Sequence, residues 1–196
     1  MNTETLFRLL TVTALILVFG VSSYFRYRAE RQGGPMQTPQ GRGFVVVMRL
    51  LGLLFLLPLF GYLINPDWVA WARLTLPDWV RWIAALLIVA IVPAVWWIFT
   101  SLGTNISPTQ ATRVGHQLIT HGPYRWVRHP LYTVGFIFYL ALSVLTGLWT
   151  LGLGILILGP ALIWRTPQEE ANLIETFGDE YREYMQRTGR FLPHMS

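Results

Sequence analysis

The side chains best suited to chemistry are gathered in one stretch, from Gly122 to Tyr132, where a long apolar run begins. Within it, Arg128 and His129 immediately precede Pro130. Proline suits the first turn of a helix, because its missing N–H has no helical partner there. We therefore expect Arg128 and His129 at the N-terminal mouth of an apolar helix, near the positive end of its dipole. Such a position favours an anionic ligand or a partner carboxylate.

The composition indicates that a membrane surrounds this mouth. The 196 residues are 53% hydrophobic and 13% charged, whereas soluble domains carry about 25% charged residues. All basic residues are arginine and the net charge is +5. The hydropathy makes anionic lipid headgroups a better counterpart of that charge than nucleic acid. The chain has no cysteine, which excludes disulfides, thiolate metal ligands and a cysteine nucleophile; we expect no metal.

Five apolar runs are long enough, or nearly so, to span a bilayer at about 20 residues each. We expect an all-α integral membrane protein whose last two runs, of 17 residues each, form a helical hairpin turning near Gly147. The first run is predicted to be an uncleaved span, because arginines follow it and no cleavage site does. The runs are Leu6–Phe25, Phe44–Ile64, Val80–Thr100, Leu131–Gly147 and Leu148–Trp164.

The arginines around these runs predict an orientation, since cytoplasmic loops carry an excess of them. Eleven fall on one side and three on the other. This favours an N-terminus outside and a C-terminus inside, with the polar loop 101–129 also cytoplasmic. The eleven are Arg26, Arg28, Arg31, Arg42, Arg113, Arg125, Arg128, Arg165, Arg182, Arg187 and Arg190, and the three are Arg8, Arg73 and Arg81.

The C-terminal tail is predicted to be an amphipathic helix that folds back over the cytoplasmic mouth. Thr166-Pro167-Gln168-Glu169 has the pattern of a capping box with proline at the first helical position. We divide the chain into three N-terminal spans (1–100) and a core (101–196). The core comprises the loop 101–129, the hairpin 130–165 and the tail 166–196.

The hairpin geometry brings the two charged ends together. Arg128 lies twenty residues before Leu148, and Glu169 lies twenty-one after it. Antiparallel helices rising about 1.5 Å per residue return these ends to the same depth. Arg128 and His129 should therefore face Arg165, Glu169 and Glu170. That convergence, beside a long polar loop, favours a ligand site.

Each of these residues also has a purely structural explanation. Arg128 could form an ion pair at a membrane edge, and His129 could cap a helix. Glu169 could serve only the capping box, and Arg165 could be an ordinary cytoplasmic flanking charge.

The ordered motifs resemble a known family. They are Gly115-His116-Gln117-Leu118-Ile119-Thr120-His121-Gly122-Pro123-Tyr124, Arg128-His129-Pro130-Leu131-Tyr132, Glu169-Glu170, and the tail pattern of Leu173, Phe177-Gly178-Asp179-Glu180-Tyr181 and Tyr184. In this order they resemble the isoprenylcysteine carboxyl methyltransferase (ICMT) family, within the wider membrane phospholipid methyltransferase-like superfamily. The resemblance covers roughly residues 101–193.

This resemblance implies an integral-membrane methyltransferase that uses S-adenosylmethionine in a cytoplasmic pocket. The pocket would be formed by the loop, the hairpin ends and the amphipathic tail helix. Glu169 would take the amino group of the cofactor, Arg165 would bind the substrate carboxylate, and Arg128 would join them in the catalytic set. Other expected cofactor contacts are Thr109, His116, Gln117, Leu118, Ile119, Tyr124, His129, Pro130, Leu131 and Tyr132. Ser107-Pro108-Thr109 resembles bacterial members of the family, so a bacterial inner membrane is expected.

The chemistry of these residue types agrees with that implication. A carboxylate is already ionised at pH 7, so methyl transfer to it needs positioning more than proton transfer. Arginine can hold a carboxylate through paired hydrogen bonds. The lipid-like or prenylated tail of the acceptor would enter sideways from the bilayer.

Other functions remain open on the sequence alone. The acceptor could be a phospholipid amine or a thiol, for which Arg165 would be a poor partner. An NADPH-dependent enzyme of the sterol-reductase type has a similar tail but calls for more basic groups. A non-enzymatic membrane scaffold would bind no cofactor and would tolerate changes at His116 or Glu169.

Overall fold

The computed structural model describes residues 2–32, 42–103, 106 and 117–194, and these form helices and their connections. The long helices are α1 (Thr3–Gln32), α2 (Arg42–Ile64), α3 (Asp78–Leu102), α4 (Pro130–Thr146) and α5 (Trp149–Phe177). Shorter elements are the 3₁₀ turns η1 (Pro66–Ala72) and η3 (Gly122–Arg125) and the helix α6 (Asp179–Arg187).

Four of these helices are long and apolar enough to cross a membrane: Thr3–Gln32, Val46–Ile64, Asp78–Leu102 and Trp149–Phe177. The fifth expected span, α4, is a shorter apolar helix of 17 residues, about 25 Å long at 1.5 Å per residue. Large apolar side chains such as Leu54, Leu86 and Leu156 stay more than half exposed on the outside of the helices. Exposed apolar surface of this extent suits lipid rather than water. The chain is therefore an all-helical integral membrane protein.

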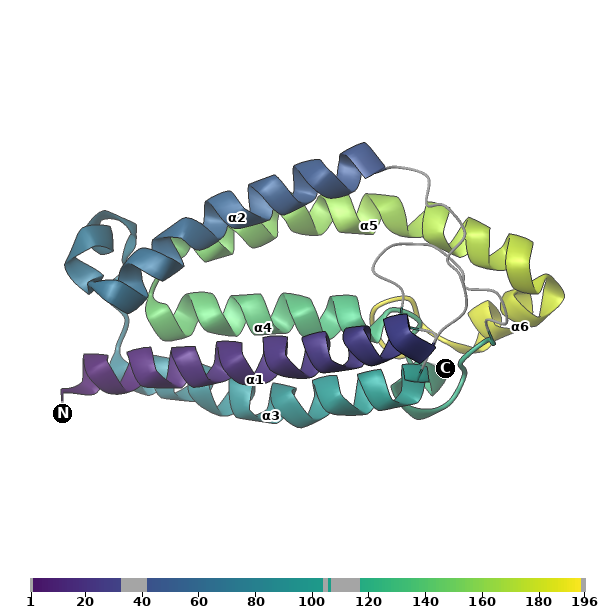
Figure 1. Cartoon of the computed structure of the whole chain (residues 1–196), viewed down its shortest axis with the longest axis horizontal. Coiled ribbons are helices and arrows are strands. Elements are labelled where there is room, and N and C mark those ends of the chain that lie inside the picture. The colour runs from purple at the N-terminus through teal and green to yellow at the C-terminus, as the bar shows by residue number, and fades with distance from the viewer. Residues whose placement is uncertain (1, 33–41, 104–105, 107–116, 195–196) are drawn as a thin grey trace.

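The helices lie in two layers (Figure 1). α2 and α5 run side by side in one layer, and α1, α3 and α4 form the other. α4 is central, because it packs against α1, α3 and α5. α5 continues beyond the end of α4 toward α6, so the polar chain segments around η3, α6 and the C-terminus gather at one end.

The predicted hairpin turn is confirmed at Gly147, which ends α4 in the left-handed conformation (φ 74°). Glycine adopts this conformation without steric cost. A Cβ atom at this position would also lie 2.8 Å from the carbonyl oxygen of Leu74. The amide of Leu74 donates to the carbonyl of Gly147 at 2.7 Å, which ties the hairpin to the segment after η1.

The predicted start of a separate helix at Thr166 is wrong. α5 continues without interruption from Trp149 to Phe177, through Pro160 and Pro167. The Thr166 hydroxyl does not cap a helix start, but donates to the carbonyl of Leu162 at 2.9 Å. Neighbouring helices and Thr hydroxyls allow proline inside membrane helices by satisfying the freed backbone groups. The amphipathic tail helix is the short α6, which begins after Gly178.

A cluster of charged side chains lies near the N-terminus, at the end of the bundle opposite to α6. Glu4 accepts hydrogen bonds from Arg73 (2.8 Å), Arg81 (2.9 Å) and the hydroxyl of Tyr62 (2.6 Å). Arg81 is 6% exposed and also donates to the carbonyl of Leu145 at 2.8 Å. This cluster joins α1, α2, α3 and α4, and the arginine counts gave no sign that these charges pair with one another.

Candidate active site

A buried carboxylate, Glu170, holds the polar end of the hairpin together. Its Oε1 accepts a hydrogen bond from Nε of Arg128 at 2.9 Å and lies 3.4 Å from Nε2 of His129. Its Oε2 accepts from Nη2 of Arg190 at 2.6 Å. The Glu170 side chain is only 3% exposed. The predicted meeting of Arg128 and His129 with Glu170 is confirmed; we call Arg128, His129, Glu170 and Arg190 the Glu170 cluster.

Arg128 is committed to contacts within the protein. Besides Glu170, its Nη1 donates to the carbonyl oxygens of Met185 (3.1 Å) and Thr188. Its side chain is 8% exposed. A guanidinium enclosed in this way joins α5 to the end of α6, and it is poorly placed to bind a ligand. The geometry thus favours the structural explanation of Arg128, as a residue that positions its neighbours.

Residues 188–193, which we call the C-terminal strap, lie along the N-terminal end of α4. The predicted return of the tail over the hairpin mouth is confirmed, although sequence reasoning missed Arg190 as a partner of Glu170. Besides the bonds of Arg128 to Thr188 and of Arg190 to Glu170, the strap is attached by Arg128 N to Gly189 O (2.9 Å), His129 N to Arg190 O (3.0 Å), Gly189 N to Trp126 O (3.2 Å) and Thr133 Oγ1 to Phe191 O (2.7 Å). The strap therefore fixes the backbone before Pro130 and the side chain of Thr133 after it.

A second, more accessible polar pair lies beside this cluster. The Tyr132 hydroxyl donates to Oε2 of Glu169 at 2.9 Å, and the ring of His129 stacks on Tyr132 with centroids 5.5 Å apart. Glu169 is half-buried, and within the described part of the chain its hydrogen bonding is through Oε2. Arg165 is half-buried and lies four residues earlier on α5, hence on the same helix face. Glu169 and Arg165 are thus less enclosed than Glu170 and Arg128.

The buried side chains of Tyr124, Tyr181 and Tyr184 stabilise this end of the bundle. The Tyr184 hydroxyl donates to the carbonyl of Tyr124 at 2.6 Å. Burial raises the pKa of Tyr184 to about 12, so the hydroxyl stays protonated at pH 7 and keeps donating. Burial also raises the pKa values of Tyr124 and Tyr181. Tyr124, expected to contact a cofactor, is 8% exposed and anchors η3 to α6.

The remaining predicted residues fall into two groups. Thr109 and His116 lie outside the described residues. Gln117 is exposed, Leu118, Ile119 and Leu131 are half-buried, and Pro130 is buried as the first residue of α4.

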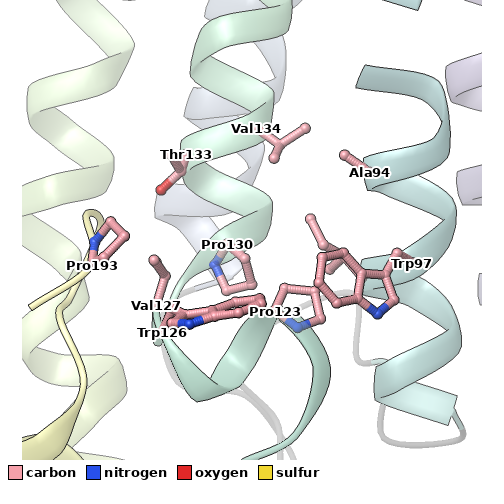
Figure 2. Close-up of a pocket in the computed structure, with 10 residues that line it drawn as sticks. Ala94, Trp97, Pro123, Trp126, Val127, Pro130, Thr133, Val134 and Pro193 are labelled. Carbon is pink, nitrogen blue, oxygen red and sulfur yellow. The ribbon is translucent and has the colours of Figure 1, made fainter. Parts of the chain in front are cut away.

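An apolar cleft of about 460 Å³ lies on the other side of α4, against α3. Figure 2 shows Ala94 and Trp97 of α3 opposite Pro130 and Val134 of α4, with Trp126 below them. Thr133 and Pro193 also line it, so the C-terminal strap forms one wall.

The sequence that forms this site matches the sequence model of a known family. A sequence model of the isoprenylcysteine carboxyl methyltransferase (ICMT) family matches residues 82–175. The matched segment includes most of α3, the Arg128-His129-Pro130 turn, the α4–α5 hairpin, and Glu169 and Glu170. Residues 82–175, just under half of the chain, are thus similar to this family. The matched segment begins within α3, whereas the resemblance seen in the sequence began at residue 101.

Curated relatives share the same part of the chain. The human protein-S-isoprenylcysteine O-methyltransferase is 37% identical over 90 residues, which are 40% of this chain and 28% of the human protein. The nickel-cobalt-cadmium resistance protein NccN of Alcaligenes xylosoxydans xylosoxydans is 35% identical over 85 residues, 43% of this chain and 39% of that protein. The chain thus matches well under half the length of these relatives.

The fold also resembles that of a solved structure. The eukaryotic intramembrane Ras methyltransferase ICMT aligns with a TM-score of 0.53 and 20% sequence identity. The alignment covers 80% of this chain and 54% of that one. At this identity the likeness concerns the fold, and at 80% of the chain it covers more than the 82–175 segment.

Proposed function

We propose that the protein is an S-adenosylmethionine-dependent methyltransferase embedded in the membrane. Its acceptor would be the carboxylate of an isoprenylated cysteine or a similar lipid-like molecule. The observation that carries this proposal is the α4–α5 hairpin of the ICMT family core, whose polar end joins Tyr132 to Glu169 and Arg128 to Glu170 at 2.9 Å each. Curated relatives that share this segment are named as methyltransferases of isoprenylcysteine.

The donor set at this end fits S-adenosylmethionine. The cofactor carries a cationic amino group, and the half-buried Glu169 offers an anionic oxygen beyond the one that Tyr132 uses. A charge-assisted hydrogen bond of this kind is about twice as strong as a neutral one. When bound, the cofactor would supply an electrophilic methyl group. Glu169, Tyr132, Gln117, Leu118 and Ile119 would hold it, together with Thr109, His116, Tyr124, His129, Pro130 and Leu131.

The protein's own residues would then act mainly by positioning. Arg165 would bind one oxygen of the acceptor carboxylate and leave the other directed at the methyl group. The carboxylate is ionised at pH 7 without a base, so the chain need supply no proton acceptor. The Glu170 cluster would fix the positions of α4, α5 and the C-terminal strap relative to one another. It would thereby hold Arg165 and Glu169 in place. Arg128 belongs to this positioning group rather than to the groups that touch substrate.

The first test is calorimetric titration of the detergent-purified full chain with S-adenosylhomocysteine. Wild-type protein should bind at micromolar concentration. Glu169→Gln should bind at least tenfold more weakly, since one charged hydrogen bond is worth about 1.5–3 kcal/mol. Glu175→Gln is the matched control, because Glu175 is an exposed glutamate of the same helix. Absence of binding to folded wild-type protein would refute the cofactor assignment.

The acceptor is tested separately by transfer of labelled methyl to N-acetyl-S-farnesylcysteine. Arg165→Gln should raise KM for this acceptor at least tenfold while leaving S-adenosylhomocysteine affinity unchanged, because Arg165 is assigned to the acceptor alone. If Arg165→Gln methylated the acceptor with unchanged KM, Arg165 would not be part of the acceptor site. Cofactor binding without transfer to any carboxylate would instead favour an amine or thiol acceptor.

A further inference from the structure

The apolar cleft beside α4 lies near the polar end of the bundle. Trp97 is five residues before the end of α3 and Ala94 eight, or about 8 and 12 Å along the helix axis. Val134 is one turn inside α4. The cleft therefore extends from the polar end of the bundle toward its apolar middle. Trp97 and Trp126 are 47% and 40% exposed, as tryptophans at a membrane interface are.

One cation marks the polar edge of this cleft. The guanidinium of Arg125 lies 3.8 Å from the centroid of the Trp126 ring, and Trp126 lines the cleft. Arg125 is exposed, and none of the ion pairs among the described residues includes it. Arg128 and Arg190, by contrast, are both paired with Glu170. Within the part of the chain that the structure describes, no carboxylate therefore neutralises Arg125, and its exposed guanidinium can meet an anion outside the protein.

We propose that the cleft binds an anionic phospholipid of the bilayer. One acyl chain would lie against Ala94, Trp97 and Val134, and the phosphate would meet Arg125 beside Trp126. The apolar lining suits a hydrocarbon chain, and Arg125, which forms no ion pair with a described residue, supplies at the polar edge the charge complementarity that selects an anionic headgroup. This inference does not depend on methyl transfer.

The bound lipid would also stabilise the C-terminal strap. Pro193 and Thr133 line the cleft, and the Thr133 hydroxyl donates to the Phe191 carbonyl at 2.7 Å. A chain in the cleft therefore packs against the strap at the point where it joins α4. The strap carbonyls also accept hydrogen bonds from the amides of Arg128 and His129. Lipid occupancy should therefore stabilise the backbone that leads into α4.

The acceptor's tail is a less suitable occupant. Tyr132, which bonds to Glu169, points toward α5, whereas the next two residues, Thr133 and Val134, line the cleft against α3 and the strap. Consecutive helical residues differ by about 100° in direction. The cleft and the Glu169 pair thus lie on different faces of α4.

The test is thermal unfolding of the delipidated full chain in detergent, titrated with dioleoylphosphatidylglycerol or dioleoylphosphatidylcholine. The anionic lipid should half-saturate the stabilisation at about fivefold lower concentration, the worth of one arginine near an anionic surface. Arg125→Gln should remove this preference. Arg187→Gln is the matched control, an exposed arginine of α6 that should retain it. Ala94→Trp should fill the cleft and abolish stabilisation by both lipids.

Equal responses to the two lipids in wild-type protein would overturn the proposal, as would a preference that survives Arg125→Gln. Displacement of phosphatidylglycerol by N-acetyl-S-farnesylcysteine would assign the cleft to the acceptor's tail instead. Arg125→Gln alters an exposed side chain, so the test holds even if Ala94→Trp fails to fold.

Discussion

Replacing Glu170 by glutamine should release the C-terminal strap while the membrane helices stay folded. The substitution keeps the shape of the side chain and removes only its charge. Arg128 and Arg190 then lose their counter-ion, although the glutamine oxygen can still accept one hydrogen bond. Arg128 also donates to the carbonyl oxygens of Met185 and Thr188. Loss of its ion pair with Glu170 should therefore first loosen the strap where it meets α4.

The size of the effect follows from burial. The side chains of Arg128 and Glu170 are 8% and 3% exposed, and breaking a buried pair costs about 3–5 kcal/mol. Arg190 is 39% exposed, so its pair adds no more than about 1 kcal/mol. The hydrogen bond retained by glutamine lowers the total toward about 3 kcal/mol. Such a change raises the population of the released strap roughly 100-fold, at 1.4 kcal/mol per factor of ten.

Hydrogen exchange followed by mass spectrometry measures this release directly. The amides of Arg128 and His129 donate to the strap carbonyls of Gly189 and Arg190. Their exchange should accelerate by up to about 100-fold in Glu170→Gln, while peptides from the middle of α4 should exchange as in the wild type. Glu175→Gln, an exposed change on the same helix, should leave both regions unaltered.

Unchanged exchange at Arg128 and His129 would refute the view that Glu170 holds the strap. Acceleration of equal size throughout α4 would refute it as well, because the helix and not the strap would then be opening. A double variant, Glu170→Gln with Arg128→Met, should recover part of the lost protection, since it removes the buried cation that the single change leaves unpaired.

Three further changes test other parts of the structure. Glu4→Gln leaves the 6% exposed Arg81 without its anion; at about 3–4 kcal/mol it should lower Tm by roughly 10 °C, with S-adenosylhomocysteine affinity, measured below Tm, unchanged. Gly147→Ala forces a side chain into φ 74° and a Cβ to 2.8 Å from the Leu74 oxygen, so it should destabilise by more than about 1 kcal/mol, again as a lower Tm. Burial raises the pKa of Tyr184 to about 12, so its contribution to stability is complete below pH 10 and lost as pH rises through 12; Tyr184→Phe should lower Tm at pH 7 and flatten its decline between pH 10 and 12.

The hairpin and its register were predictable because they depend on distances along the chain. Two apolar runs joined at a glycine return their ends to one depth at a fixed rise per residue. That argument placed Arg128 opposite Glu170, and the two side chains are 2.9 Å apart. The length of α5 was not predictable in this way. Thr166-Pro167 has the local pattern of a helix start, but in a membrane the packing of neighbouring helices outweighs the local preference.

The partners within each charged cluster were also beyond the sequence pattern. Glu170 and Glu169 are adjacent and chemically identical, and only the positions of Arg190 and Tyr132 distinguish them. Arg190 follows a non-helical turn whose direction no periodicity specifies. For the other cluster one signal was available: Glu4 is the one acidic residue before Glu30, and a lone carboxylate at the same end as Arg73 and Arg81 invites pairing.

The two neighbouring glutamates carry different tasks, and this division can be tested as a unit. Both oxygens of Glu170 are occupied by protein partners in a nearly closed environment. Glu169 is half-buried, and its hydrogen bond within the described residues comes from Tyr132 to Oε2. A carboxylate already saturated by the protein stabilises the fold, and one with an open oxygen can bind a cation. Glu170→Gln should therefore speed exchange at the strap, and it should weaken ligand affinity only as far as the strap is released. Glu169→Gln should weaken affinity while exchange at the strap stays as in the wild type. If both variants lost affinity with the strap undisturbed, Glu170 would be a ligand-binding residue and the division would be wrong.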